Sequence, residues 1–178
     1  MNIKKKTKGE LIDLIKIAIN HYNKFQKYEW LVKPAIPILF FGNVQRYLNS
    51  KTKIISVALN PSKKEFLENE KRFSFCPDKL DESDALNILD SLNEYFDFNP
   101  YDNWFNKHTE RIMNQMNTSY YNKTNYANTA LNTDFCTPLA TNPTWSKLIK
   151  EQDKKLINCL KKEGFKIWID LMKILKPD

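Results

Sequence analysis

An apolar run that ends in a polar corner constrains this chain more than any other feature. Ile54 to Leu59 are all apolar or small, and Asn60-Pro61-Ser62 follows with neither a glycine nor a charge. A short run of this kind predicts a strand over residues 53–59 that is buried on both faces, as in a parallel sheet. An amide, a proline and a hydroxyl at the end of a strand are typical of either a binding site or a tight turn.

A second stretch has the same form. Residues 128–134 (NTALNTD) alternate in the manner of a strand, and the following loop, 136–145, is rich in prolines and small polar residues. In layered α/β domains, ligands bind where the carboxyl ends of neighbouring strands meet. We therefore expect the two strands to be parallel and adjacent or nearly so, with the loops 60–62 and 136–145 facing one shared cleft.

Helical periodicity covers much of the remaining chain. It predicts helices over about 9–28, 82–97, 101–117 and 145–175, the last with a break at Gly164. Strands separated by helices indicate an α/β layered domain. With 178 residues, 42% of them hydrophobic, the chain is long enough for one sizeable core, so we expect a single domain over residues 1–178.

Charge and composition narrow the class of protein. The 28 basic and 21 acidic side chains give a net charge of +7, which suits a polyanion such as DNA, although a lysine-rich composition with few arginines is equally consistent with a plain basic surface. No apolar run approaches the length of a membrane helix, so we expect a soluble, cytoplasmic monomer. Neither a disulfide framework nor a metal site is indicated by Cys76, Cys136 and Cys159, and we expect no cofactor.

Three motifs, taken in order, resemble the uracil-DNA glycosylase superfamily. They are ALNPS at 58–62, the aromatic Phe73 shortly after it, and LNT at 131–133 with Cys136 and Pro138 following. The resemblance covers about residues 36–145. It implies a three-layer sandwich with a central, mainly parallel sheet flanked by helices. It also implies hydrolysis of the N-glycosidic bond of a flipped, uracil-like or modified base in DNA.

The resemblance and the chemistry of hydrolysis together indicate a role for each candidate residue. Hydrolysis needs a water held beneath the anomeric carbon, and Asn60 is the residue that would position it. A flipped base needs an aromatic face, which Phe73 would supply, and a partner for its polar edge, which Asn132 would supply. The candidate phosphate-binding residues at the edge of the cleft are Ser62, Lys63 and Lys64.

A structural interpretation stays open beside each functional one. Asn60 would merely close a turn, Phe73 would be a core side chain, with Phe75 as the less favoured base-stacking candidate, and Asn132 would bond to neighbouring backbone.

Asp134 is the second candidate catalytic residue and bears on the substrate. Strand alternation places Asp134 on the same face as Asn132. Because a carboxylate only accepts hydrogen bonds, it favours an exocyclic amine or a sugar hydroxyl over the carbonyls of uracil. It therefore indicates a cytosine-like or modified base, such as a hypermodified base of phage DNA. The alternative is that Asp134 caps the adjacent loop or pairs with a lysine.

Two departures from the superfamily affect these expectations. Ala58 and Ser62 stand where glycines are usual, and the final histidine-containing motif has no counterpart, because His21 and His108 both precede the second motif. We therefore expect the domain to be incomplete at its C-terminus. A non-catalytic DNA-binding module remains an alternative to an enzyme of DNA repair or phage defence. So does a different hydrolase that pairs Asp134 with an acidic residue from 94–102.

Overall fold

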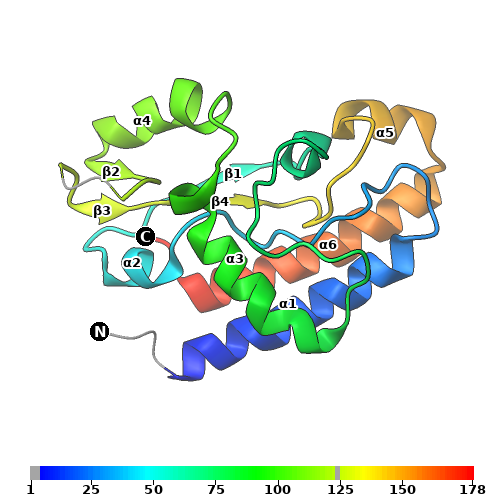
Figure 1. Cartoon of the computed structure of the whole chain (residues 1–178), viewed down its shortest axis with the longest axis horizontal. Coiled ribbons are helices and arrows are strands. Elements are labelled where there is room, and N and C mark those ends of the chain that lie inside the picture. Colours follow the sequence, from blue (N-terminus) through cyan, green and yellow to red (C-terminus); the bar gives the residue numbers. More distant parts are fainter. Residues whose placement is uncertain (1–4, 123–124) are drawn as a thin grey trace.

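The computed structural model describes residues 5–122 and 125–178, so residues 1–4 and 123–124 of the expected domain lie outside the described residues. Over these ranges the chain has a mixed α/β fold that is mostly helical (Figure 1). Its α-helices are α1 (Lys5–Phe25), α2 (Val44–Asn49), α3 (Ala85–Phe98), α4 (Glu110–Gln115), α5 (Trp145–Glu151) and α6 (Lys154–Leu175). Shorter helical turns are η1 (Lys63–Phe66), η2 (Glu82–Asp84) and η3 (Phe105–Thr109), and the strands are β1 (Ile55–Ala58), β2 (Thr118–Ser119), β3 (Asn128–Thr129) and β4 (Leu131–Asp134).

The two predicted strands are parallel neighbours, as expected. Ser56 of β1 lies opposite Asn132 of β4, and Ala58 lies opposite Asp134. On the other side of β4, Phe41 forms an antiparallel bridge with Asn132. The N–H of Phe41 donates to the carbonyl of Asn132 at 2.8 Å, and the N–H of Asn132 donates to the carbonyl of Phe41 at 3.2 Å. Backbone contacts on both sides therefore fix the position of Asn132.

The sheets are smaller than the predicted central sheet. Within the described ranges, β1 and β4 form one two-stranded sheet, and β2 and β3 form a second parallel pair. The predicted strand 128–134 is interrupted at Ala130, and its first part, β3, pairs with β2 instead of β1. Beside β4, Pro34 and Pro37 remove backbone donors from the segment that ends at Phe41, so this segment makes a single bridge rather than a full ladder.

The prediction that the first strand is buried on both faces is wrong. Val57 is 50% exposed and Leu59 is 43% exposed. Among the described strands β1 pairs only with β4, which leaves its outer side without a neighbouring strand. The apolar side chains of Val57 and Leu59 instead line a cavity. The apolar run thus contributes side chains to the wall of a cavity as well as to the core.

Long amphipathic helices cover the sheet and form the core. α1 begins and ends earlier than predicted, but its predicted apolar face is buried, at Leu11, Leu14, Ile15, Ala18 and Ile19 among others. α1 and α6 lie side by side along the molecule (Figure 1).

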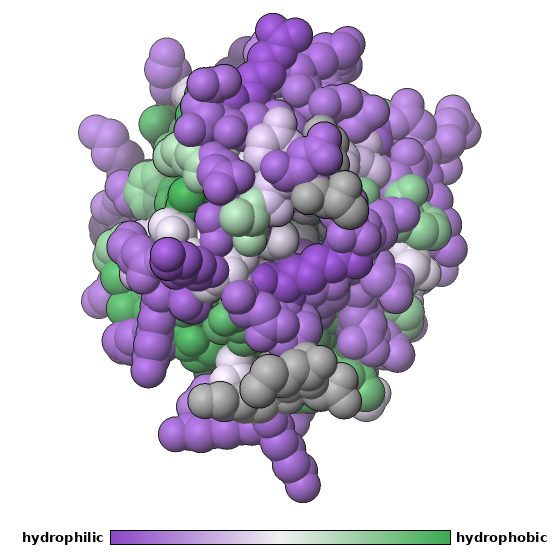
Figure 2. Space-filling model, turned by 90° about the vertical axis from the view of Figure 1, so that its left-hand side faces the viewer, coloured by the Kyte–Doolittle hydropathy of each residue, from purple (hydrophilic) through white to green (hydrophobic). Residues whose placement is uncertain are grey.

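In the part of the chain that the structure describes, no helix is long and apolar enough to cross a membrane. The end of the molecule that carries α2, β2 and β3 is mostly hydrophilic, with apolar residues in small, separate groups (Figure 2).

Gly164 does not break the C-terminal helix, contrary to the prediction. The helical tail is interrupted at Gln152 and Asp153, where the Asp153 carboxylate accepts hydrogen bonds from two backbone N–H groups and opens α6. Gly164 lies within α6, and a Cβ atom there would be 2.3 Å from the carbonyl oxygen of Cys136 and 2.6 Å from the Cα of Thr137. The glycine therefore lets α6 approach the loop that follows β4.

We expect Gly164→Ala to lower the free energy of unfolding by about 2 kcal/mol, because the new methyl group must displace backbone atoms. Gly9→Ala is the matched control. Nothing lies within 4 Å of a Cβ at Gly9, and a helical alanine there should raise stability by up to about 1 kcal/mol. Urea unfolding of the two variants measures both changes. Equal stability changes in the two variants would contradict the close approach of α6.

Candidate active site

A cavity of about 700 Å³ lies at the carboxyl ends of β1 and β4, and we call it the strand-end cavity. The loop after β1, the end of β4 and the segment leading into α5 all contribute to it. Asn60 and Asn132 both line this cavity, which confirms the expectation that the two strand ends share one cleft. Asp134 also lines it, together with Ser62, Lys63 and Lys64. Six of the seven candidate residues therefore surround one space.

Asn60 lines the cavity and also forms hydrogen bonds that connect two loops. Its side-chain amide nitrogen donates to the carbonyl of Pro61 at 2.9 Å, to the hydroxyl of Thr141 at 2.9 Å and, more weakly, to the carbonyl of Leu139 at 3.3 Å. The Asn60 side chain thus has the structural role left open from the sequence. Its side-chain oxygen accepts no hydrogen bond from the described residues, so an oriented acceptor remains for a water or a ligand.

Asn132 is held by a short chain of hydroxyl groups. The Ser56 hydroxyl donates to the side-chain oxygen of Asn132 at 2.7 Å, and the buried Tyr120 hydroxyl donates to Ser56 at 2.6 Å. This arrangement fixes the orientation of the amide, because its oxygen faces the donor hydroxyl. The side-chain nitrogen donates to no described residue. Asn132 therefore offers an N–H donor to the cavity, rather than a donor and an acceptor equally.

Asp134 is buried without the partners considered from the sequence. It is 5% exposed, and its Oδ2 has no hydrogen-bond partner within residues 5–122 and 125–178. Burial raises its pKa well above the usual range, and the nearby Glu65 raises that pKa further. Both effects disfavour the ionised form of the Asp134 carboxyl. A protonated carboxyl donates as well as accepts, so Asp134 is not restricted to accepting hydrogen bonds, contrary to the sequence-based expectation.

Glu65 is a cavity residue that the sequence argument missed. It is 5% exposed, and the Tyr95 hydroxyl donates to its Oε2 at 2.6 Å while accepting from the Tyr101 N–H at 2.9 Å. Burial raises the pKa of Glu65 to about 7, although Tyr95 and Arg72 both oppose this rise. Asp134 and Glu65 line the same cavity, so it contains two buried carboxyl groups.

The sequence around Glu65 points to a different role. Ser62-Lys63-Lys64-Glu65 matches a capping box, in which the glutamate would face the helix start in solvent. In the structure the Ser62 hydroxyl caps η1 by accepting from the Lys64 N–H at 3.1 Å, but Glu65 turns inward. The only hint in the sequence is that the apolar Phe66 and Leu67 follow it. Of the predicted acidic partners in 94–102, Glu94 is exposed and bonded to Ser74, and none lines the cavity.

The base-stacking assignment of Phe73 needs correction. Phe73 is only 2% exposed, stacks on Phe66 with ring centroids 5.3 Å apart, and is not among the residues that line the cavity. It occupies the core, as the alternative interpretation held, and Phe75 also packs against the core. The aromatic walls of the cavity come from residues that the motifs did not identify. They are Phe41, Tyr101, Trp104, Phe105 and Trp145, and of these Trp104 is 46% exposed.

The predicted phosphate-binding residues differ in whether their side chains already form hydrogen bonds within the protein. Lys63 and Lys64 are both exposed, but the Lys64 ammonium donates to the Tyr101 hydroxyl at 3.0 Å and lies over the Tyr101 ring. The hydrogen bond from Lys64 lowers the pKa of Tyr101. Since the Ser62 hydroxyl already caps η1, it is less available to a phosphate than the two lysines.

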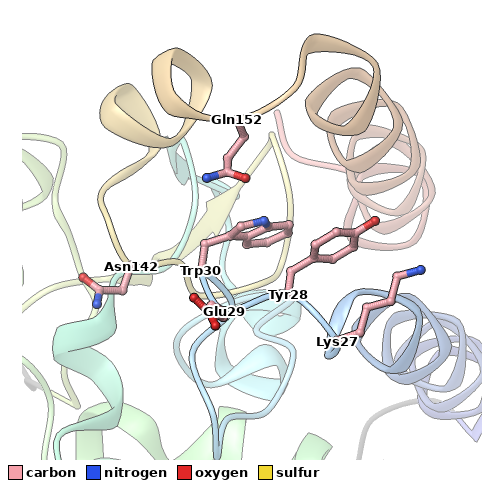
Figure 3. Close-up of a pocket in the computed structure, with 6 residues that line it drawn as sticks. All are labelled: Lys27, Tyr28, Glu29, Trp30, Asn142 and Gln152. Atoms are coloured by element: carbon pink, nitrogen blue, oxygen red, sulfur yellow. The ribbon is translucent and has the colours of Figure 1, made fainter.

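A second, smaller cavity of about 510 Å³ lies near the end of α1. Tyr28 and Trp30 lie face to face there, with ring centroids 5.4 Å apart, and Gln152 lies above Trp30 (Figure 3). None of the residues predicted from the sequence lines it. Among the residues that the structure describes, no three or more His, Cys, Asp or Glu side chains are grouped so that they could hold a metal ion. The strand-end cavity is therefore the candidate active site.

We expect the free energy of unfolding to fall as pH rises from about 4.5 to 7, because the unfolded chain releases the Glu65 proton at lower pH than the folded one. Glu65→Gln, which stays neutral, should reduce that decline by about 3 kcal/mol. Asp134 would still contribute a decline of its own. Urea unfolding at several pH values measures the effect, with the exposed Glu68→Gln as control. A decline of equal size in the Glu65 and Glu68 variants would show that Glu65 titrates normally.

Comparisons of this chain with protein-family models, curated proteins and solved structures found no match.

Proposed function

We propose that this chain is a DNA glycosylase of the uracil-DNA glycosylase type, built on the three-layer α/β architecture of that superfamily. It would hydrolyse the N-glycosidic bond of a flipped uracil-like or modified base. The observation that carries this proposal is that Asn60, Asn132 and Asp134 line one cavity at the ends of two adjacent parallel strands. The motifs that resemble the superfamily can form one site only if the ends of these two strands lie together.

The cavity has the size and chemistry that a nucleoside needs. Its volume of about 700 Å³ is within the range of small-molecule sites, and aromatic side chains form much of its wall. A flipped base would lie against Phe41 or Trp104, both of which line the cavity. The Asn132 N–H would donate to a carbonyl oxygen of the base, while the free oxygen of Asn60 would hold the attacking water.

The choice of base depends on Asp134 in its protonated form. A neutral carboxyl can donate to the N3 of cytosine while accepting from its amine, or accept from the N3–H of uracil while donating to its carbonyl. Both pyrimidine classes therefore fit this group. A modified cytosine, including a hypermodified one, remains within the proposed substrate range, and a role in repair or in phage defence is compatible with it.

DNA is the proposed partner because the cavity opens beside basic side chains. Lys63 and Lys64 are exposed and line the cavity, and the chain has a net charge of +7. Phosphate contacts of this kind would hold the strand while the base enters the cavity. Affinity should accordingly fall steeply as salt concentration rises.

A non-catalytic DNA-binding module is the second candidate, and one observation favours it. All the side-chain donors of Asn60 bind protein groups, so Asn60 has a structural use even without a reaction. Such a module would bind DNA with the same salt dependence but release no base.

One experiment separates these two functions. The protein is incubated in excess with single-stranded and double-stranded oligonucleotides that carry uracil, cytosine or a modified cytosine, and the strands are then treated with alkali. The glycosylase proposal predicts strand cleavage at the position of one of these bases. Binding without any alkali-labile site on the whole panel would favour the module, and the absence of DNA binding at low salt would exclude both.

A further inference from the structure

We propose that Glu65 and Asp134 act together as the base and the acid of the reaction, with one negative charge shared between them. This inference rests on the proposed function and adds two roles to the same site. Neither the motifs nor the resemblance assigns Glu65 any part, and strand alternation indicated Asp134 only as an ionised acceptor.

The geometry of the cavity supports the pairing. Both side chains are 5% exposed, and both line the strand-end cavity. Asp134 Oδ2 is buried with no partner among the described residues, so the cavity has an unsatisfied polar atom in its wall. Among the described residues the Glu65 side chain has one hydrogen-bond partner, the Tyr95 hydroxyl at 2.6 Å, and that bond fixes its position.

The surroundings assign the two roles differently. Glu65 faces Tyr95 on α3 and the Arg72 guanidinium, both of which favour its ionised form. No cationic side chain among the described residues lowers the pKa of Asp134, and the Glu65 charge opposes its ionisation. The other charged or titratable groups of the cavity are Lys63, Lys64 and Tyr101. Glu65 is thus the group that carries the charge, and Asp134 is the group that carries the proton.

The proton balance of the hydrolysis then closes within the site. The bond between the base and C1′ breaks with its electron pair going to the base, and the water oxygen bonds to C1′. The water gives its proton to the Glu65 carboxylate, and the Asp134 carboxyl gives its proton to the departing base. Transfer of the new Glu65 proton to Asp134, directly or through a water, restores both groups. The net reaction consumes one water and releases the neutral base and an abasic sugar.

The test is the pH dependence of single-turnover base release by the full chain. The wild-type rate should rise with pH up to about 7 and then level off, as the Glu65 carboxylate forms. Glu65→Gln should lose this rise and be slower by about a hundredfold at pH 8. The exposed Glu68→Gln, three residues further on, should match the wild type.

A second variant tests the same assignment without removing the carboxyl group. Tyr95→Phe deletes the hydrogen bond that favours ionised Glu65, so the midpoint of the rate profile should move to higher pH. An unchanged midpoint in this variant, or wild-type rates and pH dependence in Glu65→Gln, would overturn the acid–base pair while leaving the glycosylase proposal intact. If the wild-type protein releases no base from any substrate, the proposed function itself fails, and the pair fails with it.

Discussion

Asn60→Ala should slow single-turnover base release by about a thousandfold, the scale expected when one positioned catalytic contact is lost. Asn60 lines the cavity, and its side-chain oxygen accepts no hydrogen bond from the described residues, so it can hold the attacking water. DNA affinity should change little, because phosphate contacts provide most of it. The loss should therefore be in the rate of the bound complex, measured with the enzyme in excess over DNA.

The structural bonds of Asn60 require a matched control. Its amide nitrogen connects the loop after β1 to the hydroxyl of Thr141, so Asn60→Ala should also lower the free energy of unfolding by about 1 to 2 kcal/mol. Thr141→Val removes one of these bonds and leaves the Asn60 oxygen in place. We expect a similar loss of stability with a far smaller loss of rate. Equal rate losses in the two variants would mean that Asn60 acts only by holding the loops.

Asn132→Asp should change which base is released, by about a hundredfold in the ratio of rates on cytosine-type and uracil-type substrates. The Ser56 hydroxyl would still donate to one side-chain oxygen, and at a pH high enough to ionise the new carboxyl an acceptor would replace the N–H donor of Asn132. An acceptor favours the exocyclic amine of cytosine and disfavours the carbonyl at the same position of uracil.

The base preference is measured by single-turnover release from matched uracil and cytosine oligonucleotides. Ser56→Ala is the control, because it keeps Asn132 but frees the amide to rotate. It should weaken discrimination without reversing it. A variant at Asn132 that slows both substrates equally would show that this residue supports the loop or the reaction rather than recognition of the base.

Strand patterns and the polar ends of strands could be predicted from the sequence. The apolar run before Asn60 and the alternation around Asn132 specify two short strands, and parallel pairing brings their carboxyl ends together. The motif residues at those ends therefore lie on one cavity, as the sequence indicated. Local pattern is sufficient here because each residue directly follows, or lies within, the strand that places it.

Contacts between distant segments could not be predicted in the same way. Glu65 is directed inward by Tyr95, a residue of α3 thirty positions later, while its local sequence matches a solvent-facing cap. Phe73 has the spacing of a base-stacking residue, but its partners Phe66 and Tyr95 draw it into the core. Gly164 was predicted to break the helix because the sequence does not show that the loop at Cys136 packs against it.

The most direct test of the account is a count of the products that the wild-type protein forms from DNA. After a single turnover, the released molecule is identified by its mass and its amount is compared with that of alkali-labile strand. We expect a free base and an abasic site in equal amounts, with both strongly reduced in Asn60→Ala. Release of a nucleoside or nucleotide, or intact DNA after prolonged incubation with every substrate of the panel, would contradict hydrolysis of the N-glycosidic bond.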